Sequence, residues 1–441
     1  MDAAKLLDVL KGLSHEVRDV DVGNHVDRVH IKDLTPLQFA TQYVSKNKPV
    51  IIEGALDAWP AMRLWNDGYL IRAAGSQPIT VDVTPNGRGD AVTHVTRHVP
   101  NPASKSGCCS EACDAAEEGS DAAASCSAPD GCSHRSQPAE ISADQGADPD
   151  EAAPSTSYAP SDIRDLAAQG TQWFVTPCEL KMTLEDFFDL FRSSRASEGA
   201  TRVVPYVQHQ NSSLTQEFAF LTKDIQPRIS WADEVFGGSP DAVNLWIGDD
   251  RSVTSFHKDH YENLYGVVRG TKVFHLLPPS DIYRMALKRY PAANYVAVND
   301  PGTVPDSHAS TTGGASSGSE GQPKLDLGRT QLVPQLKEPA HEVAWSEVEV
   351  EGPGSTASTD TTPLFHDPEL PQPLIAEVGP GSLLYLPSIW YHRVSQVCTQ
   401  KKSGHDYVIA VNFWYDMQFD AKWAYFKTIE ALALQLKLAE V

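Results

Sequence analysis

The chain has 441 residues, 41% of them hydrophobic, which is enough to build a sizeable packed core in two or three domains. Its 58 acidic residues outnumber its 36 lysines and arginines and give a formal charge of −22, which argues against nucleic acid or an anionic membrane as a partner. No apolar run reaches the roughly 18–20 residues of a membrane span, and the start lacks a signal-peptide layout. We therefore expect a cytoplasmic or nuclear protein without a membrane partner.

Residues 1–100 predict an α/β extension that packs on the core. Leucines recur at helical spacing over residues 6–13 and indicate a short amphipathic helix. A buried strand is expected at 50–52, followed by a glycine turn and a helix that carries Trp59 and Trp65.

Residues 101–170 have a different composition, rich in Ala, Ser, Asp, Gly and Pro. Such a segment cannot bury enough surface to offset the entropy of ordering, so we expect a disordered acidic insert. Shorter stretches at 301–325 and 352–362 are interpreted as loops in the same way. The chain has seven cysteines, an odd number that argues against a disulfide framework. A zinc site in the insert remains an alternative without a familiar spacing, with these donors: Cys108, Cys109, Cys113, Cys126, Cys132 and His134.

Residues 171–441 predict a second, β-rich domain. A helix begins at Thr183, which forms a capping box with Asp186. Two alternating strands around Arg269-Gly270-Thr271 indicate a hairpin, and 420–440 is a helix. Many short strands with helical flanks are typical of a mainly β barrel or jelly roll, an α+β chain overall.

The stretch "VTSFHKDH" places His257 and Asp259 on one face of a strand, because residues i and i+2 project the same way. His392, in "LLYLPSIWYHRV", is the best third ligand. Two histidines and one carboxylate form the facial triad of non-haem Fe(II) oxygenases, which leaves positions open for a co-substrate and O2. Each of these residues taken alone is more typical of ordinary packing, and the HExxH spacing of zinc enzymes is absent.

Lys272 follows in the next expected strand. A lysine inside a barrel is costly unless it meets an anion, and the far carboxylate of a dicarboxylate co-substrate would supply one. The alternative is an exposed hairpin lysine. Thr254 and Asn263 stand close enough in the sequence to add hydrogen bonds to such a ligand.

Several motifs together resemble the jumonji-C (JmjC) 2-oxoglutarate oxygenases. "NLWIGDDRSVTSFHKDHYENLYGVVRGTKVFHLLPP", "PGSLLYLPSIWYHRV" and "AVNFWYD" occur in the order of the small hydroxylase branch, which includes the asparaginyl hydroxylase of hypoxia-inducible factor. "TPLQFATQYVSKNKPVIIEGALDAWPA" and "YVQHQNSSL" extend the resemblance to the JmjC domain-containing protein 7 type of lysyl hydroxylase. It covers most of 20–100 and 175–441.

This resemblance implies a double-stranded β-helix (cupin) core and Fe(II) bound by His257, Asp259 and His392. It implies hydroxylation of a protein lysine at C3, with 2-oxoglutarate and O2 consumed and succinate and CO2 released. The residues implied around the co-substrate are Lys272, Thr254, Tyr206, Asn263, Asn412 and Trp414.

Other functions stay open at this point. A histone lysine demethylase would use the same iron chemistry on an N-methyl group, and a hydroxylase could act on another target. A claimed histone-tail peptidase activity lacks a water-activating base here, and a non-catalytic cupin-type binding protein would not need the intact ligands. Glu262 or Asp416 could meet the ammonium of a substrate lysine. The branch also implies a homodimer through the C-terminal helix.

Overall fold

The computed structural model describes residues 3–95, 172–196, 203–298, 330–350, 362–398 and 406–438. The predicted insert, the two predicted loops apart from Thr362, and the candidate zinc ligands lie outside these residues. The domain boundaries stay a prediction. Within the described residues, Cys178 and Cys398 are buried and free.

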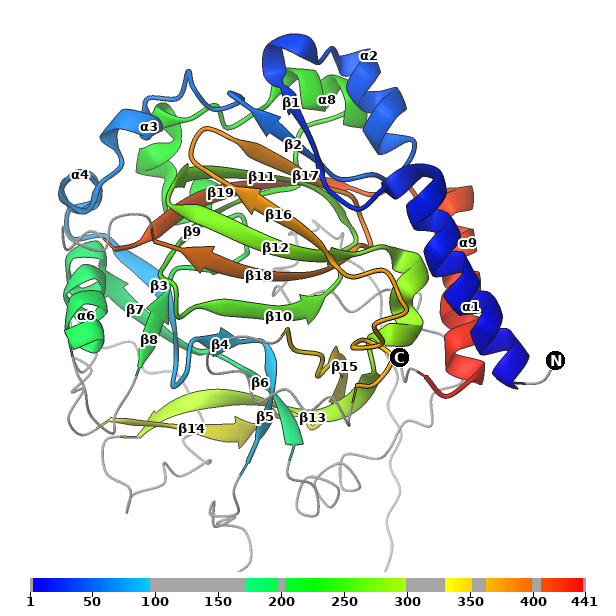
Figure 1. The fold of residues 1–441 in the computed structure, drawn as a ribbon. Helices are drawn as coiled ribbons and strands as arrows, with labels where there is room; N and C mark the ends of the chain where they lie inside the picture. The colour runs from blue at the N-terminus through cyan, green and yellow to red at the C-terminus, as the bar shows by residue number, and fades with distance from the viewer. Residues whose placement is uncertain are drawn as a thin grey trace, which may run out of the picture.

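Two β-sheets face each other at the centre of the fold (Figure 1). Tyr265 of the larger sheet packs edge-on against Phe274 of the smaller one, with ring centroids 5.1 Å apart. The predicted jelly roll with helical flanks is confirmed. The larger sheet contains, in order, β1 (Asp27–His30), β2 (Val50–Glu53), β17 (Leu383–Leu386), β11 (Tyr261–Arg269), β19 (Val408–Asp416) and β9 (Ala242–Gly248). The smaller sheet contains β16 (Leu374–Val378), β12 (Thr271–Leu277), β18 (Tyr391–Val397), β10 (Val253–His257) and β4 (Arg88–Gly89).

Helices cover the outer face of the larger sheet. Every residue of β19 from Val408 to Tyr415 is buried, as expected for a strand that is covered on both faces. Trp59 packs against Phe413 on this outer face, in a large apolar cluster that includes helical residues such as Phe187. The helices of this layer are α2 (Pro36–Phe39), α3 (Ala61–Leu64), α4 (Asp67–Ala74), α6 (Leu184–Ala196), α7 (Ser213–Gln216) and α8 (Ser230–Phe236).

Two local expectations can be compared with these helices. The capping box before α6 is confirmed, because the Thr183 hydroxyl accepts a hydrogen bond of 3.1 Å from the backbone N–H of Asp186. The helix expected to carry Trp59 and Trp65 is wrong in extent, since both tryptophans flank the short α3. Trp65 has an extended backbone, with φ −74° and ψ 97°, and this ends the helix.

The predicted hairpin around Arg269-Gly270-Thr271 is wrong. β11 pairs with β17 and β19, whereas β12 pairs with β16 and β18, so the two strands lie in opposite sheets. Gly270 has φ +72°, a conformation that a glycine adopts easily, and it turns the chain from one sheet to the other. The alternating pattern identified the strands but not the sheet to which each belongs.

Two further sheets adjoin the barrel in Figure 1: one lies below β4, and the other lies on the left, next to α6. In one, β5 and β6 pair antiparallel, and β6 pairs in parallel with β13. In the other, β3 lies between β7 and β8. Their strands are β3 (Pro78–Thr84), β5 (Ala91–His94), β6 (Gln172–Thr176), β7 (Cys178–Thr183), β8 (Val204–Tyr206), β13 (Leu287–Val298), β14 (Gln331–Leu336) and β15 (Glu342–Ser346).

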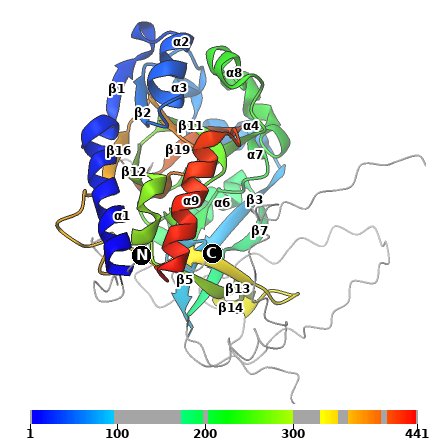
Figure 2. The same cartoon turned by 90° about the vertical axis from the view of Figure 1, so that its right-hand side faces the viewer.

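The predicted N-terminal and C-terminal helices, α1 (Ala3–Val17) and α9 (Ala421–Gln435), are confirmed. They lie side by side on one flank of the barrel in both views (Figures 1 and 2). Leu10 of α1 and Ala433 of α9 are buried in one apolar cluster there. Among the described helices, none is long and apolar enough to span a membrane.

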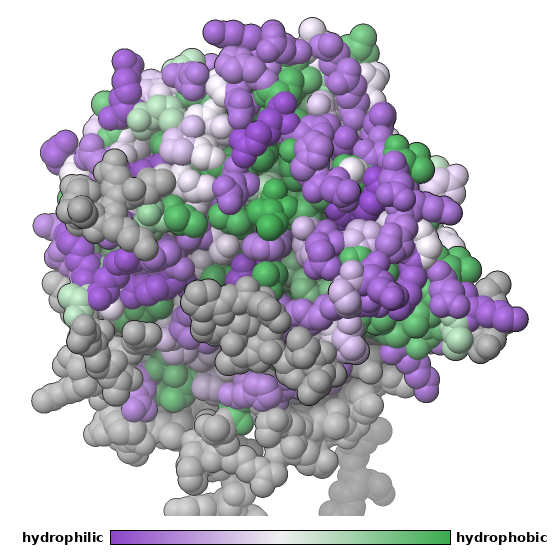
Figure 3. All heavy atoms as spheres, viewed as in Figure 1, coloured by the Kyte–Doolittle hydropathy of each residue, from purple (hydrophilic) through white to green (hydrophobic). Residues whose placement is uncertain are grey.

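The outer face of the smaller sheet is turned toward the viewer in Figure 1. Figure 3 shows that this side of the molecule is largely hydrophilic, with hydrophobic side chains near its centre. Ile375 of β16 and Val397 of β18 are about half exposed. Phe274, Leu276 and Val394 are buried in a cluster shared with the larger sheet, and they mark the inner face, where the candidate site is found.

Candidate metal and co-substrate site

A β-bulge in β10 determines which side chains of this strand point to the inner face of the smaller sheet. His257 is the cross-strand partner of His392, and Thr254 is the partner of Val394. The step from Thr254 to His257 is three residues, whereas the step from Val394 to His392 is two, so β10 holds one extra residue. Without this bulge, Thr254 and His257 would point to opposite faces. The bulge therefore places both on the face that carries His392.

Asp259 completes a cluster of three potential metal ligands. Its carboxylate oxygens lie 3.8 Å from Nε2 of His257 and 3.5 Å from Nε2 of His392. One ligand atom from each residue lies within 4.8 Å of the others. The backbone N–H of Ile389 donates a 2.8 Å hydrogen bond to the carbonyl of Asp259. Ile389 has φ +60°, which is strained for a β-branched residue, and such strain is typical of functional sites.

The two imidazoles present the same nitrogen to the cluster. Nδ1 of His257 lies 2.8 Å from the carbonyl of Ser255, and Nδ1 of His392 lies 3.0 Å from the carbonyl of Trp390. A carbonyl only accepts, so each Nδ1 carries a proton and each Nε2 faces the cluster. Burial, and secondly the neighbouring His257, lowers the pKa of His392 to about 4, so this imidazole is neutral near pH 7. Two imidazoles and one carboxylate fit the facial triad of Fe(II).

Lys272 lies further along the same inner face. Leu276 of β12 pairs with His392, and Lys272 stands four residues before it, roughly 13 Å along the strand. The opposite residue on β18 is Gln396. Thr254 pairs with Val394, between these two rows. The bulge, the two histidines and the lysine thus form one continuous strip.

The Lys272 ammonium is buried among tyrosines. The residue is 1% exposed, and Nζ donates a 2.8 Å hydrogen bond to the hydroxyl of Tyr206. Nζ also lies 5.2 Å from the ring centroid of Tyr206 and 5.8 Å from that of Tyr265. Burial lowers the pKa of Lys272 to about 7. Within the described parts of the chain no carboxylate forms an ion pair with it, so the site suits an added anion.

Gln396 is a site residue that the sequence reasoning missed. It is 4% exposed, and neither its amide nitrogen nor its amide oxygen has a hydrogen-bond partner among the described residues. Gly248 leaves room for it, because a Cβ there would lie 2.8 Å from the Gln396 nitrogen and 2.5 Å from the ring of Tyr206. The available signal was its position four residues after His392, which in a strand is the same face.

The remaining predicted site residues lie on the larger sheet. Trp246 donates a 2.8 Å hydrogen bond to Asn412, and Asn412 donates one of 3.3 Å to Asn263. The ring of Trp246 lies 6.1 Å from that of Tyr206, which connects this group to Lys272. Trp414 is placed differently: it stacks on Tyr261 with centroids 4.9 Å apart.

Trp345 of β15 was also missed. Its ring stacks on His257, with centroids 5.9 Å apart and planes 9° apart. Its indole N–H donates a 2.8 Å hydrogen bond to the hydroxyl of Ser255, which in turn donates to the carbonyl of Asp90. This aromatic wall fixes the orientation of the first histidine. An isolated tryptophan far along the sequence gave no signal of the contact.

Comparison with known proteins places the chain in a family. A family model described as a cupin-like domain matches residues 36–421. "Lysine-specific demethylase JMJ32" of Arabidopsis thaliana is 34% identical over 426 residues, which cover 96% of this chain and 91% of that protein. The chain belongs to the cupin-like JmjC family. JmjC proteins are Fe(II)- and 2-oxoglutarate-dependent oxygenases, as the resemblance of the motifs implied.

Two other relatives match this JmjC protein over nearly its whole length. "Bifunctional peptidase and (3S)-lysyl hydroxylase JMJD7" of Homo sapiens is 30% identical over 403 residues, covering 91% of this chain and 87% of that protein. "JmjC domain-containing protein E" of Dictyostelium discoideum is 28% identical over 424 residues, covering 96% and 93% of the two chains.

The two acidic candidates for recognition of a substrate lysine differ in their exposure to solvent. Glu262 is 5% exposed, and its carboxylate accepts hydrogen bonds from the Tyr385 hydroxyl at 2.7 Å and from the Ser388 hydroxyl at 2.9 Å. These bonds engage both oxygens, so Glu262 holds the strands together instead of facing a ligand. Asp416 is exposed at the end of β19.

Proposed function

We propose that this JmjC protein is an Fe(II)- and 2-oxoglutarate-dependent protein hydroxylase that acts on lysine side chains at C3. The observation that carries the proposal is the strip on the inner face of the smaller sheet. At one end, His257, Asp259 and His392 offer a facial set of metal donors. At the other end, Lys272 is a buried lysine that donates to Tyr206 and has no carboxylate partner among the described residues. A dicarboxylate that chelates the metal would satisfy that cation.

The residues of the chain would divide the work as follows. Iron supplies the redox chemistry in which O2, 2-oxoglutarate and a C–H bond give succinate, CO2 and a C–OH group. The two Nε2 atoms and the Asp259 carboxylate hold the metal on one side. The Lys272 ammonium and the Tyr206 hydroxyl bind the far carboxylate, and Thr254 lies between them and the metal. His392 and Lys272 are buried, whereas His257 and Asp259 are partly exposed, on the side from which a protein substrate would approach.

The choice of a lysine substrate rests on the relatives. One relative is named a lysyl hydroxylase and another a lysine-specific demethylase, and both names specify lysine. The 34% identity to the demethylase makes demethylation the second candidate. The peptidase activity in the name of the human relative has no support in this site. Among the described residues, the cluster contains one carboxylate, Asp259, and this is a metal ligand, so no second one is available there to activate water.

The first test is co-substrate turnover. With Fe(II) and 2-oxoglutarate, the wild type is expected to release succinate, and Lys272→Met is expected to raise the Michaelis constant for 2-oxoglutarate about 10- to 100-fold. Lys288→Met is the matched control, because Lys288 is an exposed lysine paired with Glu347 and should leave the constant unchanged. Absence of iron-dependent succinate from the wild type would favour a non-catalytic cupin-type binding protein.

The second test separates the two lysine reactions. Incubation with a basic protein extract should add about 16 Da to lysines without release of formaldehyde, because C3 carries no nitrogen and its hydroxyl is stable, whereas a hydroxylated N-methyl group breaks its C–N bond. Loss of a methyl group with formaldehyde would instead establish the demethylase. Turnover with no modified lysine would point to another target residue.

The proposal includes a homodimer through α9. Phe419 and Tyr425 are 62% and 68% exposed, which is unusual for aromatic side chains and is consistent with a further contact. Light scattering of the purified chain should give twice the monomer mass of 48.1 kDa. A monomer at micromolar concentration would contradict this part of the proposal.

A further inference from the structure

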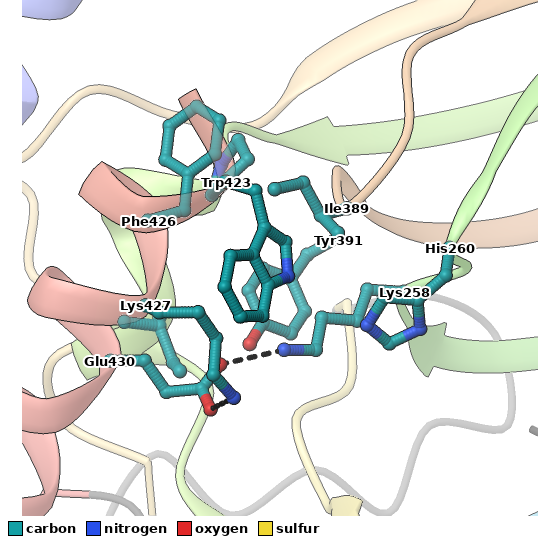
Figure 4. A pocket seen from close by; sticks show the side chains of 10 residues that line it. Lys258, His260, Ile389, Tyr391, Trp423, Phe426, Lys427 and Glu430 are labelled. Atoms are coloured by element: carbon teal, nitrogen blue, oxygen red, sulfur yellow. Dashed lines mark hydrogen bonds and ion pairs between the residues drawn. The ribbon is translucent and has the colours of Figure 1, made fainter. Parts of the chain in front are cut away.

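Helix α9 reaches the metal-ligand segment through a buried ion pair. Lys258, the residue between the ligands His257 and Asp259, extends away from them toward α9 (Figure 4). Its Nζ lies 2.8 Å from Oε2 of Glu430. The other carboxylate oxygen of Glu430 accepts from Nζ of Lys427, at 2.7 Å.

Glu430 is 6% exposed, although it carries a charge. Burial by itself would raise the pKa of Glu430, but Lys258 and Lys427 lower it below its ordinary value, so the carboxylate stays ionised. A buried carboxylate that meets two ammonium groups is fixed in place, since either oxygen would be costly to leave unpaired. The α9 side of the contact is therefore rigid.

The direction of Lys258 determines the direction of its two neighbours. β10 ends at His257, and beyond it the side chains separate: Nζ of Lys258 meets Glu430, whereas His257 and Asp259 meet His392. Rotation of the segment that released Lys258 would also turn both ligands away from a common point.

The same part of α9 also contacts the second ligand strand. Nζ of Lys258 lies 5.9 Å from the ring centroid of Tyr391, which directly precedes His392. Ile389, whose N–H holds the carbonyl of Asp259, lines a small cavity together with Trp423 and Phe426 of α9 (Figure 4). One helix thus supports the connections that carry all three donors.

We propose that Glu430 is a positioning residue that, through Lys258, holds His257 and Asp259 in the geometry that binds metal. This inference rests on the proposed function, because it assigns the helix a role in metal affinity at the same site. Partners behind the ligands orient them, and their loss typically weakens metal binding about 10- to 100-fold. The ion pair would act as such a partner from outside the barrel.

The test is a titration of the full chain with Mn(II), with free Mn(II) followed by electron paramagnetic resonance. Glu430→Gln and Lys258→Met should each weaken Mn(II) binding about tenfold. Lys427→Met is the matched control: it removes the other partner of Glu430, but Lys427 has no contact with the ligand segment in the described structure. We expect the control to bind Mn(II) within about twofold of the wild type.

The double variant Glu430→Gln with Lys258→Met separates positioning from general destabilisation. If the two residues act through each other, the double variant should be no weaker than either single variant, whereas independent effects would multiply. Equal affinity in the wild type and Glu430→Gln, or equal loss in Lys427→Met, would overturn the inference. A wild type that binds no Mn(II) would instead overturn the proposed function itself.

Discussion

Lys272 is buried in the barrel, and its protonation should control binding of the co-substrate. Burial lowers its pKa to about 7, and a bound carboxylate would favour the protonated form. Below this pKa the lysine is already charged, so affinity should be constant. Above it, binding must take up a proton, and the dissociation constant should rise by up to about tenfold per pH unit. Calorimetry of 2-oxoglutarate binding to the Mn(II)-loaded protein at pH 7–9 measures this slope.

Lys272→Met serves as the control for that slope, because it removes the titrating group. Its weaker binding should not change between pH 7 and 9. An equal slope in the wild type and in Lys272→Met would mean that another group takes up the proton. No slope in the wild type would mean that the lysine stays charged throughout this range.

Gln396 offers both of its amide atoms to the space beside Lys272. Its N–H groups could donate to the same carboxylate, and loss of a hydrogen bond to a charged group typically costs about 1.5–3 kcal/mol. We expect Gln396→Leu to raise the Michaelis constant for 2-oxoglutarate at least tenfold, with Mn(II) affinity unchanged. A loss of Mn(II) affinity would show that the change disturbs the strand as a whole.

At the scale of single residues, the sequence predicted those whose chemistry is visible in a local pattern. His257 and Asp259 are separated by the strand period, and the structure places them together with His392. Thr254 lies on the same face only because of the bulge. No residue in this stretch predicts a bulge. The sequence could not identify Gln396 as a site residue, because glutamines are common on protein surfaces. It becomes a candidate only when the structure shows that its amide is buried without a hydrogen-bond partner among the described residues.

At the scale of elements, strand identity was predictable and strand partnership was not. The apolar alternation marked β11 and β12, but a short turn between two strands usually makes a hairpin. Here Gly270 carries the chain to the opposite sheet, so Lys272 lies beside β18 and not beside β11. The position of the lysine relative to the histidines depends on this connection.

Gly270→Ala should therefore destabilise the fold. The residue has φ +72°, and an added Cβ would lie 2.6 Å from a methyl group of Val408. The left-handed conformation alone costs an alanine about 1–2 kcal/mol, so we expect a loss of about 2 kcal/mol in the free energy of unfolding measured in urea. Gly12→Ala is the matched control, because Gly12 lies in α1 with nothing within 4 Å. It should stabilise the protein by about 0.5–1 kcal/mol.

At the scale of the whole molecule, strand pairing brings together the ends of long segments. His94 of β5 is the direct partner of Gln172 of β6, and Val298 of β13 is the partner of Gln331 of β14. The described strands on the two sides of each segment are therefore paired with each other. The predicted insert and loop rest on composition, which carries no information on whether the flanking strands pair.

Removal of residues 101–165 should leave the catalytic core intact. The remaining link joins the ends of β5 and β6, which are already paired, and a shorter loop lowers the entropy cost of closure. We expect unchanged succinate production and an unchanged or higher melting temperature by calorimetry. A loss of turnover with the melting temperature intact would show that the removed residues contribute to catalysis.

The pairing of His257 with His392 across two strands has a mechanical consequence. An ion that binds both imidazoles would be a reversible cross-link between the neighbouring strands β10 and β18. A ligand that binds only the folded state raises stability with its concentration. Hydrogen exchange of the backbone amides in these two strands should therefore slow when metal is added and recover on chelation. Metal supply would then change the stability of this strand pair as well as the activity.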